Sequence, residues 1–501
     1  MIQAFDRPQD AANWLRAQGC VDLHSDSRRT RSGDGLIAWP GARHDPRDQV
    51  QSALKSGAKA ALVEANDLRS DWLADWKGLP IASMADLKHQ SGHVSSAFYS
   101  DPSQHLTLVA VTGTNGKTTI TWWLAQALNA LSRPCGLAGT LGVGAINRLR
   151  TTGLTTLQSV EWHAALANMR ADGLSACALE ASSIGVAEGR LNGTQIEVAI
   201  FTNLTQDHLD YHGDMAHYWE AKKRLMLWPH LRHAVINIDD PHGAELANDW
   251  PSSAALWTTS VRGNARLTAS NILVTPQGVR FEVIERSADQ ESRADLSIQA
   301  AGTFNVSNAL QVLAALRALG IPLAHAVEAF SGLSSAPGRL QPVHQGEQGP
   351  WVLVDYAHTP DAVAQVLGAL RPAVQSRGGQ LWCVLGCGGN RDASKRGPMA
   401  ATAEAHAEHV VLTSDNPREE DPESILSAMQ HGLSRAPEWV GVDRAQAIAY
   451  AISHAKDADV IVIAGKGHED YQEVKGQRLP FNDADVAQAA WHLRMHSGGR
   501  A

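Results

Sequence analysis

The sequence predicts an α/β protein built on mainly parallel, doubly wound sheets. From about residue 105 to 340, short apolar runs alternate with segments of helical length, and the same alternation returns after a Pro-Gly-Arg boundary at 337–339. A glycine-rich turn, GTNGKTT, joins one apolar run to an amphipathic segment. Because 501 residues exceed what one hydrophobic core supports, we expect about two to four domains.

The first 100 residues contain one clear strand pattern, Ala60–Glu64, and no turn suited to a nucleotide. The segment 99–104 (YSDPSQ) is rich in turn residues and is interpreted as a linker.

The stretch 106–128 is the most informative part of the chain. Its apolar run ends in the turn Gly113-Thr-Asn-Gly116, and a helix is expected from Lys117. Backbone N–H groups of such a turn and the positive end of a helix bind polyphosphate. We expect Lys117 to reach the terminal phosphates and Thr118 to hold Mg²⁺. An ordinary strand-to-helix turn is the alternative, but strand, loop and helix occur in the required order, so the sequence predicts a nucleoside triphosphate site.

Polar residues follow the next expected strands, where ligands bind in α/β sheets. Glu180 and Ser182 follow a strand at 176–179, and His208 follows one at 198–202. A carboxylate and a neutral imidazole are plausible Mg²⁺ ligands near a triphosphate. His208 and His212 also have the spacing of a zinc pair, but the run HLDYH contains no Glu, so magnesium is preferred. A third strand is expected at 234–238, and antiparallel strands are expected within 265–300.

After residue 338, four polar segments each close an apolar strand, so we expect all four at one sheet edge. The strands are expected at 351–355, 381–385, 410–413 and 460–464. Arg391 and Arg418 are suited to clamp a carboxylate, and Glu469 is suited to accept from an ammonium group. An amino acid fits that combination.

Composition narrows the class of protein. A net charge of −9 argues against nucleic acid as the main partner, and no apolar run is long enough to span a membrane. The N-terminus lacks the pattern of a signal peptide, so the cytoplasm is the expected location. The five cysteines are scattered, so no disulfide framework is expected, and Cys383 and Cys387 are interpreted as core residues.

The motifs VTGTNGKTT, LEASS, TNLTQDHLDYHG, GTFNVSNAL, VDYAHTPDA, LGCGGNRD, SDNPR and AGKGHEDYQ resemble those of the Mur ligases, the ATP-dependent amide ligases of peptidoglycan synthesis. The resemblance runs from Asp26 to about residue 495. The DNPR segment, Asp415 to Arg418, is similar to that of members that add meso-diaminopimelate rather than lysine.

The resemblance implies three domains: a UDP-substrate domain (1–100), a central ATPase domain (101–338) and a C-terminal amino-acid domain (339–501). It implies that ATP activates the D-glutamate carboxylate of UDP-MurNAc-L-Ala-D-Glu as an acyl phosphate, which the diaminopimelate amine then attacks. Mg²⁺ is the implied cofactor, and a monomer is the implied assembly.

Roles for individual residues also follow from the resemblance. The implied catalytic and metal-binding residues are Lys117, Thr118, Glu180, His208 and a carbamylated Lys222. The implied ATP contacts are Gly113, Thr114, Asn115, Gly116, Lys117, Thr118, Thr119, Asn305, Arg339, Asp355 and His358. The implied UDP-substrate contacts are Ser27, Thr151, Thr152, Ser182, Glu188 and Arg190. The implied amino-acid contacts are Arg391, Asp415, Asn416, Pro417, Arg418, Gly465 and Glu469.

The chain departs from the family pattern in its UDP-substrate segments. Ile184 stands where the family has His, Glu188 where it has Gln, and Arg150 where it has Asn. These changes affect the expected contacts to the UDP-substrate and leave the ATP and amino-acid motifs intact.

Parts of the sequence are also compatible with a nucleotide-gated binding protein and with other ligases. A nucleotide-gated binding protein would have no need of Arg391, Asn416, Arg418 and Glu469 together. Among enzymes, the alternatives are a lysine-adding ligase, a MurF-type ligase and a folylpolyglutamate synthetase. The DNPR segment argues against the first, and the HLDYHG and DSR segments argue against the last.

Overall fold

The computed structural model describes residues 2–41, 44–275, 278–287, 290–300, 302–346 and 348–497. The chain forms two compact units. The first contains Met1–Thr259 with Gln311–Ala329, and the second contains Ser260–Leu310 with Phe330–Ala501.

The N-terminal part of the first unit is a parallel sheet in the order β1-β5-β4-β3-β2. Its core lies on both faces: α1 and α4 contribute Leu15 and Val94 to one side, and α2 and α3 contribute Val50 and Trp72 to the other. The elements are β1 (Gln3–Phe5), α1 (Pro8–Ala17), β2 (Leu23–His24), β3 (Gly35–Ala38), α2 (Val50–Lys55), β4 (Ala60–Glu64), α3 (Ser70–Asp75), β5 (Ile81–Met84) and α4 (Leu87–Phe98).

The central part of the first unit holds strands in the order β12-β11-β10-β6-β9-β7-β8. They pair in parallel except β7 with β8. The strands are β6 (Thr107–Thr112), β7 (Cys135–Gly139), β8 (Gly142–Ala145), β9 (Ala176–Glu180), β10 (Val198–Phe201), β11 (His233–Asn237) and β12 (Ala255–Ser260). The helices are α5 (Lys117–Ala130), α6 (Ser159–Ala171), α7 (Ser183–Ala187), α8 (Leu209–His212), α9 (Met215–Met226), α10 (Pro241–Asn248) and α12 (Leu323–Glu328), while α11 (Phe304–Ala318) continues from the second unit.

The second unit begins with an antiparallel meander of β13 (Leu267–Thr275), β14 (Gly278–Arg286) and β15 (Glu291–Ile298). Its main sheet has the order β16-β17-β21-β18-β19-β20 and is parallel except for β16 with β17. The strands are β16 (Gln341–His344), β17 (Trp351–Asp355), β18 (Leu381–Cys387), β19 (His409–Ser414), β20 (Trp439–Gly441) and β21 (Val460–Ala464), with a hairpin of β22 (Tyr471–Val474) and β23 (Gln477–Pro480). The helices are α13 (Pro360–Arg377), α14 (Arg396–His406), α15 (Pro422–Gln430), α16 (Arg444–His454) and α17 (Asp483–Ser497).

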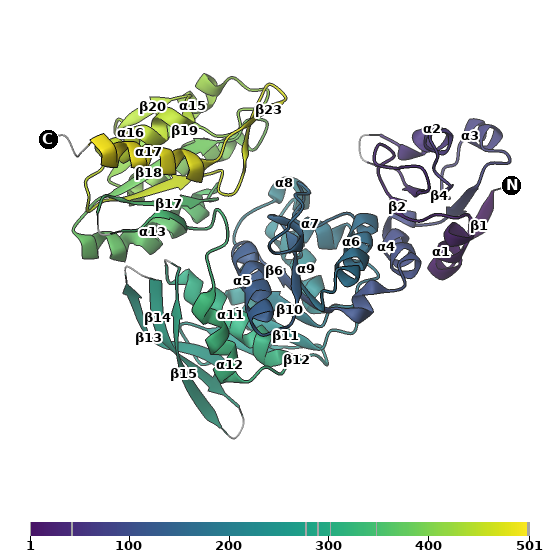
Figure 1. Cartoon of the computed structure of the whole chain (residues 1–501), viewed down its shortest axis with the longest axis horizontal. Helices are drawn as coiled ribbons and strands as arrows, with labels where there is room; N and C mark the ends of the chain where they lie inside the picture. The colour runs from purple at the N-terminus through teal and green to yellow at the C-terminus, as the bar shows by residue number, and fades with distance from the viewer. Residues whose placement is uncertain are drawn as a thin grey trace. The chain divides into compact units, whose positions relative to one another are not determined.

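Both faces of this second sheet are covered, as a doubly wound fold requires. Side chains of α13, α14 and α15, such as Val366 and Ile425, pack on one face with Leu353. Side chains of α16 and α17, such as Ile448 and Ala487, pack on the other face with Val352. Helices α16 and α17 also contact each other (Figure 1). The near-continuous apolar strands follow from this burial, since neither face of a central strand meets water.

The expected strands of the central and C-terminal parts are confirmed within a few residues, as is the antiparallel character of the meander. The sequence predicts one strand in the N-terminal part, whereas the structure has a five-stranded sheet there. The other strands, β1, β2, β3 and β5, are only two to four residues long and therefore leave no clear pattern in the sequence. Across the described residues, no helix combines the length and apolar character that a membrane span requires.

Candidate functional site

The turn between β6 and α5 is held open by two glycines with positive φ. Gly113 has φ +142° and Gly116 has φ +89°. A Cβ on Gly113 would lie 1.8 Å from Thr202 Oγ1, so the residue directly after β10 leaves no room for a side chain there. Backbone N–H groups also secure the turn, because Asn115 N donates to Asn203 Oδ1 at 2.9 Å. The result is a turn whose shape is fixed by the adjacent strand.

The side chain of Lys117 folds over this turn. Its Nζ donates to the carbonyl oxygens of Gly113 (2.8 Å) and Thr114 (2.9 Å). Lys117 is the first residue of α5 and is only half-buried. A cation in this position, beside backbone N–H groups at a helix start, is suited to polyphosphate.

Glu180 is the buried carboxylate of this region, with 1% of its surface exposed. Its Oε2 accepts from the Thr118 hydroxyl at 3.1 Å, and its Oε1 accepts from Thr140 N at 2.9 Å. Gly139 makes room for it, since a Cβ there would lie 2.3 Å from Oε1. The structure therefore brings together Thr118 and Glu180, two of the expected magnesium ligands, as a pair of hard oxygen donors.

Lys222 lies on α9, as expected, and is 1% exposed. Its Nζ donates to Gly113 O at 2.7 Å and lies 4.3 Å from the centroid of the Tyr218 ring. Lys117 Nζ donates to the same carbonyl oxygen, so two lysine nitrogens share one acceptor. Burial and the charge of Lys117 hold the pKa of Lys222 well below its usual range, while Asp207 opposes that effect. The neutral amine is thereby favoured.

His208 and His212 flank the same tyrosine. The ring centroid of Tyr218 lies 6.3 Å from that of His208 and 5.2 Å from that of His212. His208 Nε2 is 3.5 Å from Asp207 Oδ2, and burial lowers the pKa of His208. His212 Nε2 instead contacts Ser183 Oγ at 3.0 Å. Across the part of the chain that is described, no group of three or more His, Cys, Asp or Glu is arranged to hold a metal, so the zinc pattern gains no third ligand.

The six expected UDP-substrate residues all lie in the first unit. Arg190 is ion-paired with Glu188 at 2.7 Å and donates to Thr156 O at 3.0 Å, and Thr156 Oγ1 contacts Ser182 Oγ at 3.0 Å. Arg190, Glu188 and Ser182 are therefore gathered around one threonine. Thr151 is exposed and Thr152 bonds within its own turn to Leu154 O.

Ser27 lies in the N-terminal part, between β2 and β3. A cavity of about 250 Å³ is lined by Asp22 and Arg29, which are near Ser27 in the sequence, and by Arg150 and Glu161 among others. The departure at Arg150 therefore places a guanidinium-bearing residue on the wall of a cavity in the first unit.

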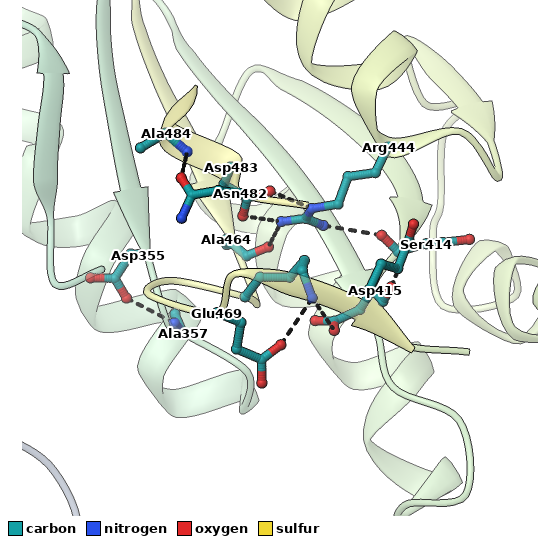
Figure 2. Close-up of polar contacts among 12 residues, drawn as sticks. Asp355, Ala357, Ser414, Asp415, Arg444, Ala464, Glu469, Asn482, Asp483 and Ala484 are labelled. Carbon is teal, nitrogen blue, oxygen red and sulfur yellow. Dashed lines mark hydrogen bonds and ion pairs between the residues drawn. The ribbon is translucent and has the colours of Figure 1, made fainter. Parts of the chain in front are cut away.

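The remaining expected ATP contacts, Asn305, Arg339, Asp355 and His358, belong to the second unit. Asp355 ends β17 and accepts from Leu340 N (2.7 Å) and Ala357 N (2.8 Å), the latter drawn in Figure 2. Burial raises the pKa of the Asp355 carboxyl, and Arg339 opposes that rise. His358 is exposed, with Nδ1 against Tyr356 O at 2.7 Å.

The strand-end segments of the second unit meet at one sheet edge, as expected. Asn416 Nδ2 donates to Glu469 Oε2 at 2.7 Å, which joins the segment after β19 to the segment after β21. Gly465 has φ +113°, and a Cβ on it would lie 2.7 Å from Asp415 Oδ2. Burial raises the pKa of the Asp415 carboxyl, and Lys466 opposes that rise.

Arg418 lies beside this network in a left-handed conformation, φ +53°. Its backbone N–H donates to Glu473 O at 2.9 Å, and its Nη1 donates to Gly389 O at 2.8 Å. A Cβ on Gly388 would lie 3.0 Å from Arg418 Nη1 and 3.7 Å from Arg391 Cγ, so both arginines border the same glycine. The Asn416 carbonyl oxygen would lie 3.9 Å from the same Cβ, so Arg418, Arg391 and Asn416 gather around Gly388.

Three residues that the sequence did not single out complete these arrangements. Thr140 orients Glu180 through both its N–H and its hydroxyl. Lys466, fully buried, donates to Asn416 Oδ1 (3.0 Å) and Glu469 Oε2 (2.9 Å). Arg444 is 1% exposed and pairs with Asp483. Lys466 lies inside a strand-end motif and could have been inferred, whereas Arg444 starts a helix and carries no such signal.

Comparison with known proteins agrees with this geometry. Residues 111–316 match the Mur ligase middle domain, and residues 338–467 match the Mur ligase glutamate ligase domain. A relative from Acidovorax sp. (strain JS42), named UDP-N-acetylmuramoyl-L-alanyl-D-glutamate--2,6-diaminopimelate ligase, is 50% identical over 491 residues, 96% of each chain. The chain belongs to the Mur ligase family.

Other Mur ligases extend the comparison. A relative of the same name from Janthinobacterium sp. (strain Marseille) is 44% identical over 97% of each chain. A solved structure titled with that enzyme name has a TM-score of 0.67 and 35% identity, covering 95% of this chain and 96% of its own. The expected family, the ligase class and the α/β fold are confirmed, while the roles of individual residues and the domain limits at 100 and 338 stay predictions.

Proposed function

We propose that this Mur ligase joins meso-diaminopimelate to the D-glutamate of UDP-MurNAc-L-Ala-D-Glu at the expense of ATP, in peptidoglycan precursor synthesis. The observation that carries the proposal is the sheet edge where Arg418 borders the hydrogen-bonded pair of Asn416 and Glu469. A guanidinium next to a carboxylate suits an amino-acid head group that bears both charges. The names of the relatives at 50% and 44% identity support the same substrates.

The proposed reaction has two steps. A γ-carboxylate oxygen of D-glutamate attacks the γ-phosphorus of ATP, the bond to the β-phosphate oxygen breaks, and ADP leaves. The amine of diaminopimelate then attacks the acyl carbon, the carbon–oxygen bond to phosphate breaks, and phosphate leaves with one former carboxylate oxygen. The nitrogen loses one proton, which the released phosphate or solvent takes up. Positioning and charge neutralisation dominate such phosphoryl transfer, and Lys117 is the residue proposed to contact the phosphates.

The donor set near the turn fits Mg²⁺, because the buried Glu180 carboxylate and the Thr118 hydroxyl are hard oxygen donors. We assign Thr118, Glu180 and His208 as its residues, together with Lys222 if that lysine is carbamylated. Bound Mg²⁺ would neutralise the charge that develops on the transferring phosphoryl group.

The environment of Lys222 supports a carbamate. Its depressed pKa favours the neutral amine, which is the form that attacks CO₂ and loses a proton to give a carbamate. The new oxygen atoms would add hard donors beside the turn that Lys222 already contacts through Gly113 O.

The selectivity for diaminopimelate over lysine is assigned to the two arginines. Lysine has only an ammonium at its distal end, whereas diaminopimelate adds a carboxylate there. Arg391 and Arg418 supply the charge that this carboxylate requires. We also propose that the reaction is cytoplasmic, where ATP is available, and that the protein acts as a monomer.

An isotope experiment tests the two-step reaction. The enzyme is given UDP-MurNAc-L-Ala-D-Glu labelled with ¹⁸O in the γ-carboxylate, together with ATP, Mg²⁺ and meso-diaminopimelate. We expect one ¹⁸O in the released phosphate and a tripeptide product detected by mass spectrometry. Tripeptide formed with unlabelled phosphate would rule out the acyl phosphate, and absence of tripeptide would rule out the ligase assignment.

A further inference from the structure

Arg444 makes an unusually complete set of contacts for a buried cation. Its side chain and that of Asp483 are both 0% exposed, and its Nε and Nη2 each donate to the Asp483 carboxylate at 2.7 Å. Nη1 also donates to Ser414 O at 3.2 Å, and Nη2 to Ala464 O at 3.0 Å. Arg444 is the first residue of α16, where the helix dipole disfavours a cation, so the stability of that helix does not explain its position.

The two carbonyl groups that Arg444 binds are the last ones of two different strands. Ser414 ends β19 and Ala464 ends β21, and β18 lies between these strands in the sheet. Asp415 and Gly465 follow directly. They begin the segments 415–418 and 465–470, which carry expected amino-acid contacts and are called the amino-acid loops below. Figure 2 shows the guanidinium pointing toward the Ser414 and Ala464 carbonyls and the Asp483 carboxylate. One side chain therefore ties together the points at which both loops begin.

Arg444 also holds both ends of the segment 464–483. It binds the Ala464 carbonyl at the start and the Asp483 carboxylate at the end. The same segment carries Glu469 and the β22–β23 hairpin, and the hairpin bonds back to the segment after β19. Those bonds run from Gln472 Nε2 to Asp415 O (2.7 Å), from Glu473 N to Asn416 Oδ1 (2.9 Å) and from Arg418 N to Glu473 O (2.9 Å).

We propose that Arg444 and Asp483 are positioning residues of the amino-acid site, fixing the segment 415–418 relative to Glu469. This inference rests on the proposed function, because it concerns the same site. The Arg444 charge also acts on Asp415 and Glu469, two expected amino-acid contacts, so removing it changes the electrostatics of the site as well as these hydrogen bonds. The pair acts by holding the two loops and the hairpin in a fixed relative arrangement. Its loss should therefore raise the KM for the amino acid and leave the KM values of the other substrates unchanged.

The test separates positioning from stability. Arg444→Met alone leaves a buried, unpaired Asp483 and is expected to destabilise the fold, whereas Arg444→Met/Asp483→Leu removes both charges and can restore stability. We expect the double variant to fold but to show a KM for meso-diaminopimelate at least about 10-fold higher, since small misplacements of binding groups are costly. The KM values for ATP and UDP-MurNAc-L-Ala-D-Glu should stay within about two-fold of the original.

A matched control is available in the N-terminal part of the first unit. Arg47 is 3% exposed, pairs with Asp45 at 2.7 Å and donates to the carbonyl oxygens of Glu64 and Asn66. Arg47→Met/Asp45→Leu therefore removes a similar pair away from the amino-acid loops. We expect it to leave the KM for meso-diaminopimelate unchanged.

Amide hydrogen exchange gives a readout that does not depend on activity. We expect faster exchange in residues 415–418 and 465–470 of the Arg444→Met/Asp483→Leu variant, and no change there in the Arg47→Met/Asp45→Leu control. A folded Arg444→Met/Asp483→Leu variant with the original amino-acid KM and original exchange would overturn the positioning role. If the unmodified enzyme releases no phosphate with any amino acid, the proposed function fails, and the exchange comparison still decides the role of the pair.

Discussion

At the scale of single residues, burial shifts the balance between the charged and the neutral form of a side chain. Lys222 is the clearest case, because α9 places its amine against Gly113 O and beside Lys117 rather than in water. The sequence identified Lys222 through its motif, but not its state of ionisation. That state depends on Tyr218, Gly113 and Lys117, which reach it only once the chain is folded.

The depressed pKa of Lys222 has a measurable consequence for stability. Between the folded pKa and the ordinary lysine pKa of about 10.4, the unfolded chain binds more protons than the folded one, so the free energy of unfolding rises with pH. The cost of burying the amine is fully present below the folded pKa and disappears above the unfolded one. Lys222→Met should remove this pH dependence in metal-free, CO₂-depleted buffer, as denaturant unfolding between pH 7 and pH 10.5 would measure.

The same variant tests the role of Lys222 in the reaction. We expect kcat to fall by about 100-fold or more, by analogy with the loss of one group that stabilises developing charge. Short carboxylic acids should restore part of the activity of Lys222→Ala, because they can replace a carbamate. Equal stability curves for the original and the Met variant would contradict the assigned environment, and absence of rescue would leave the carbamate unsupported.

The Arg418 backbone is left-handed, and its Nε lies 3.6 Å from the Glu473 carboxylate of the hairpin. A non-glycine residue in the left-handed region costs roughly 1–2 kcal/mol, and the hairpin residue Glu473 holds it there. Arg418→Ala should raise the KM for meso-diaminopimelate by about 30-fold or more, equivalent to about 2 kcal/mol for a lost buried ion pair. Lys475→Ala, an exposed cation of the same hairpin, is the control and should change this KM little. Equal effects of the two substitutions would argue against a specific carboxylate contact.

At the scale of elements, the turn between β6 and α5 shows how far a local pattern can be taken. The sequence located the strand, the turn and the helix, because the alternation of apolar and polar residues and the glycines are local signals. It did not predict that Thr202, directly after β10, would abut Gly113. That contact depends on the pairing of β6 with β10, which residues far apart in sequence decide.

Substitution of Gly113 should therefore cost more than backbone strain alone. Gly113→Ala places a methyl group against Thr202 Oγ1, and Thr202 Oγ1 also donates to Asn115 O at 2.6 Å within the turn. We expect the KM for ATP to rise at least about 10-fold, because the turn must shift. Gly173→Ala is the matched control, with φ +80° and no atom within 4 Å of the new Cβ.

The two glycine variants are compared by denaturant unfolding and by the KM for ATP. Gly173→Ala should lose about 1–2 kcal/mol from its left-handed backbone and keep its KM. Gly113→Ala should lose more stability and its affinity as well. A Gly113→Ala enzyme with the stability and ATP KM of the control would show that the turn adapts to the extra methyl group.

At the scale of the whole molecule, the sequence predicted the fold class more completely than it predicted the short strands. The long apolar strands of both larger sheets were recognisable, whereas the N-terminal sheet is built from strands as short as Leu23–His24 and was largely missed. The strand-end motifs of the second unit could be grouped correctly, because parallel strands end at one edge. Arg444 could not, since it meets Asp483 and two strand ends only through the packing of α16 and α17.

The selectivity of the ligase for meso-diaminopimelate over L-lysine can be measured directly. The most direct measurement is phosphate release from ATP with Mg²⁺ and UDP-MurNAc-L-Ala-D-Glu, comparing meso-diaminopimelate with L-lysine at equal concentration. We expect release that depends on meso-diaminopimelate, with little stimulation by L-lysine. Stimulation by L-lysine alone would contradict the assignment of Asp415 to Arg418, and release that depends on neither amino acid would contradict the proposed ligase reaction.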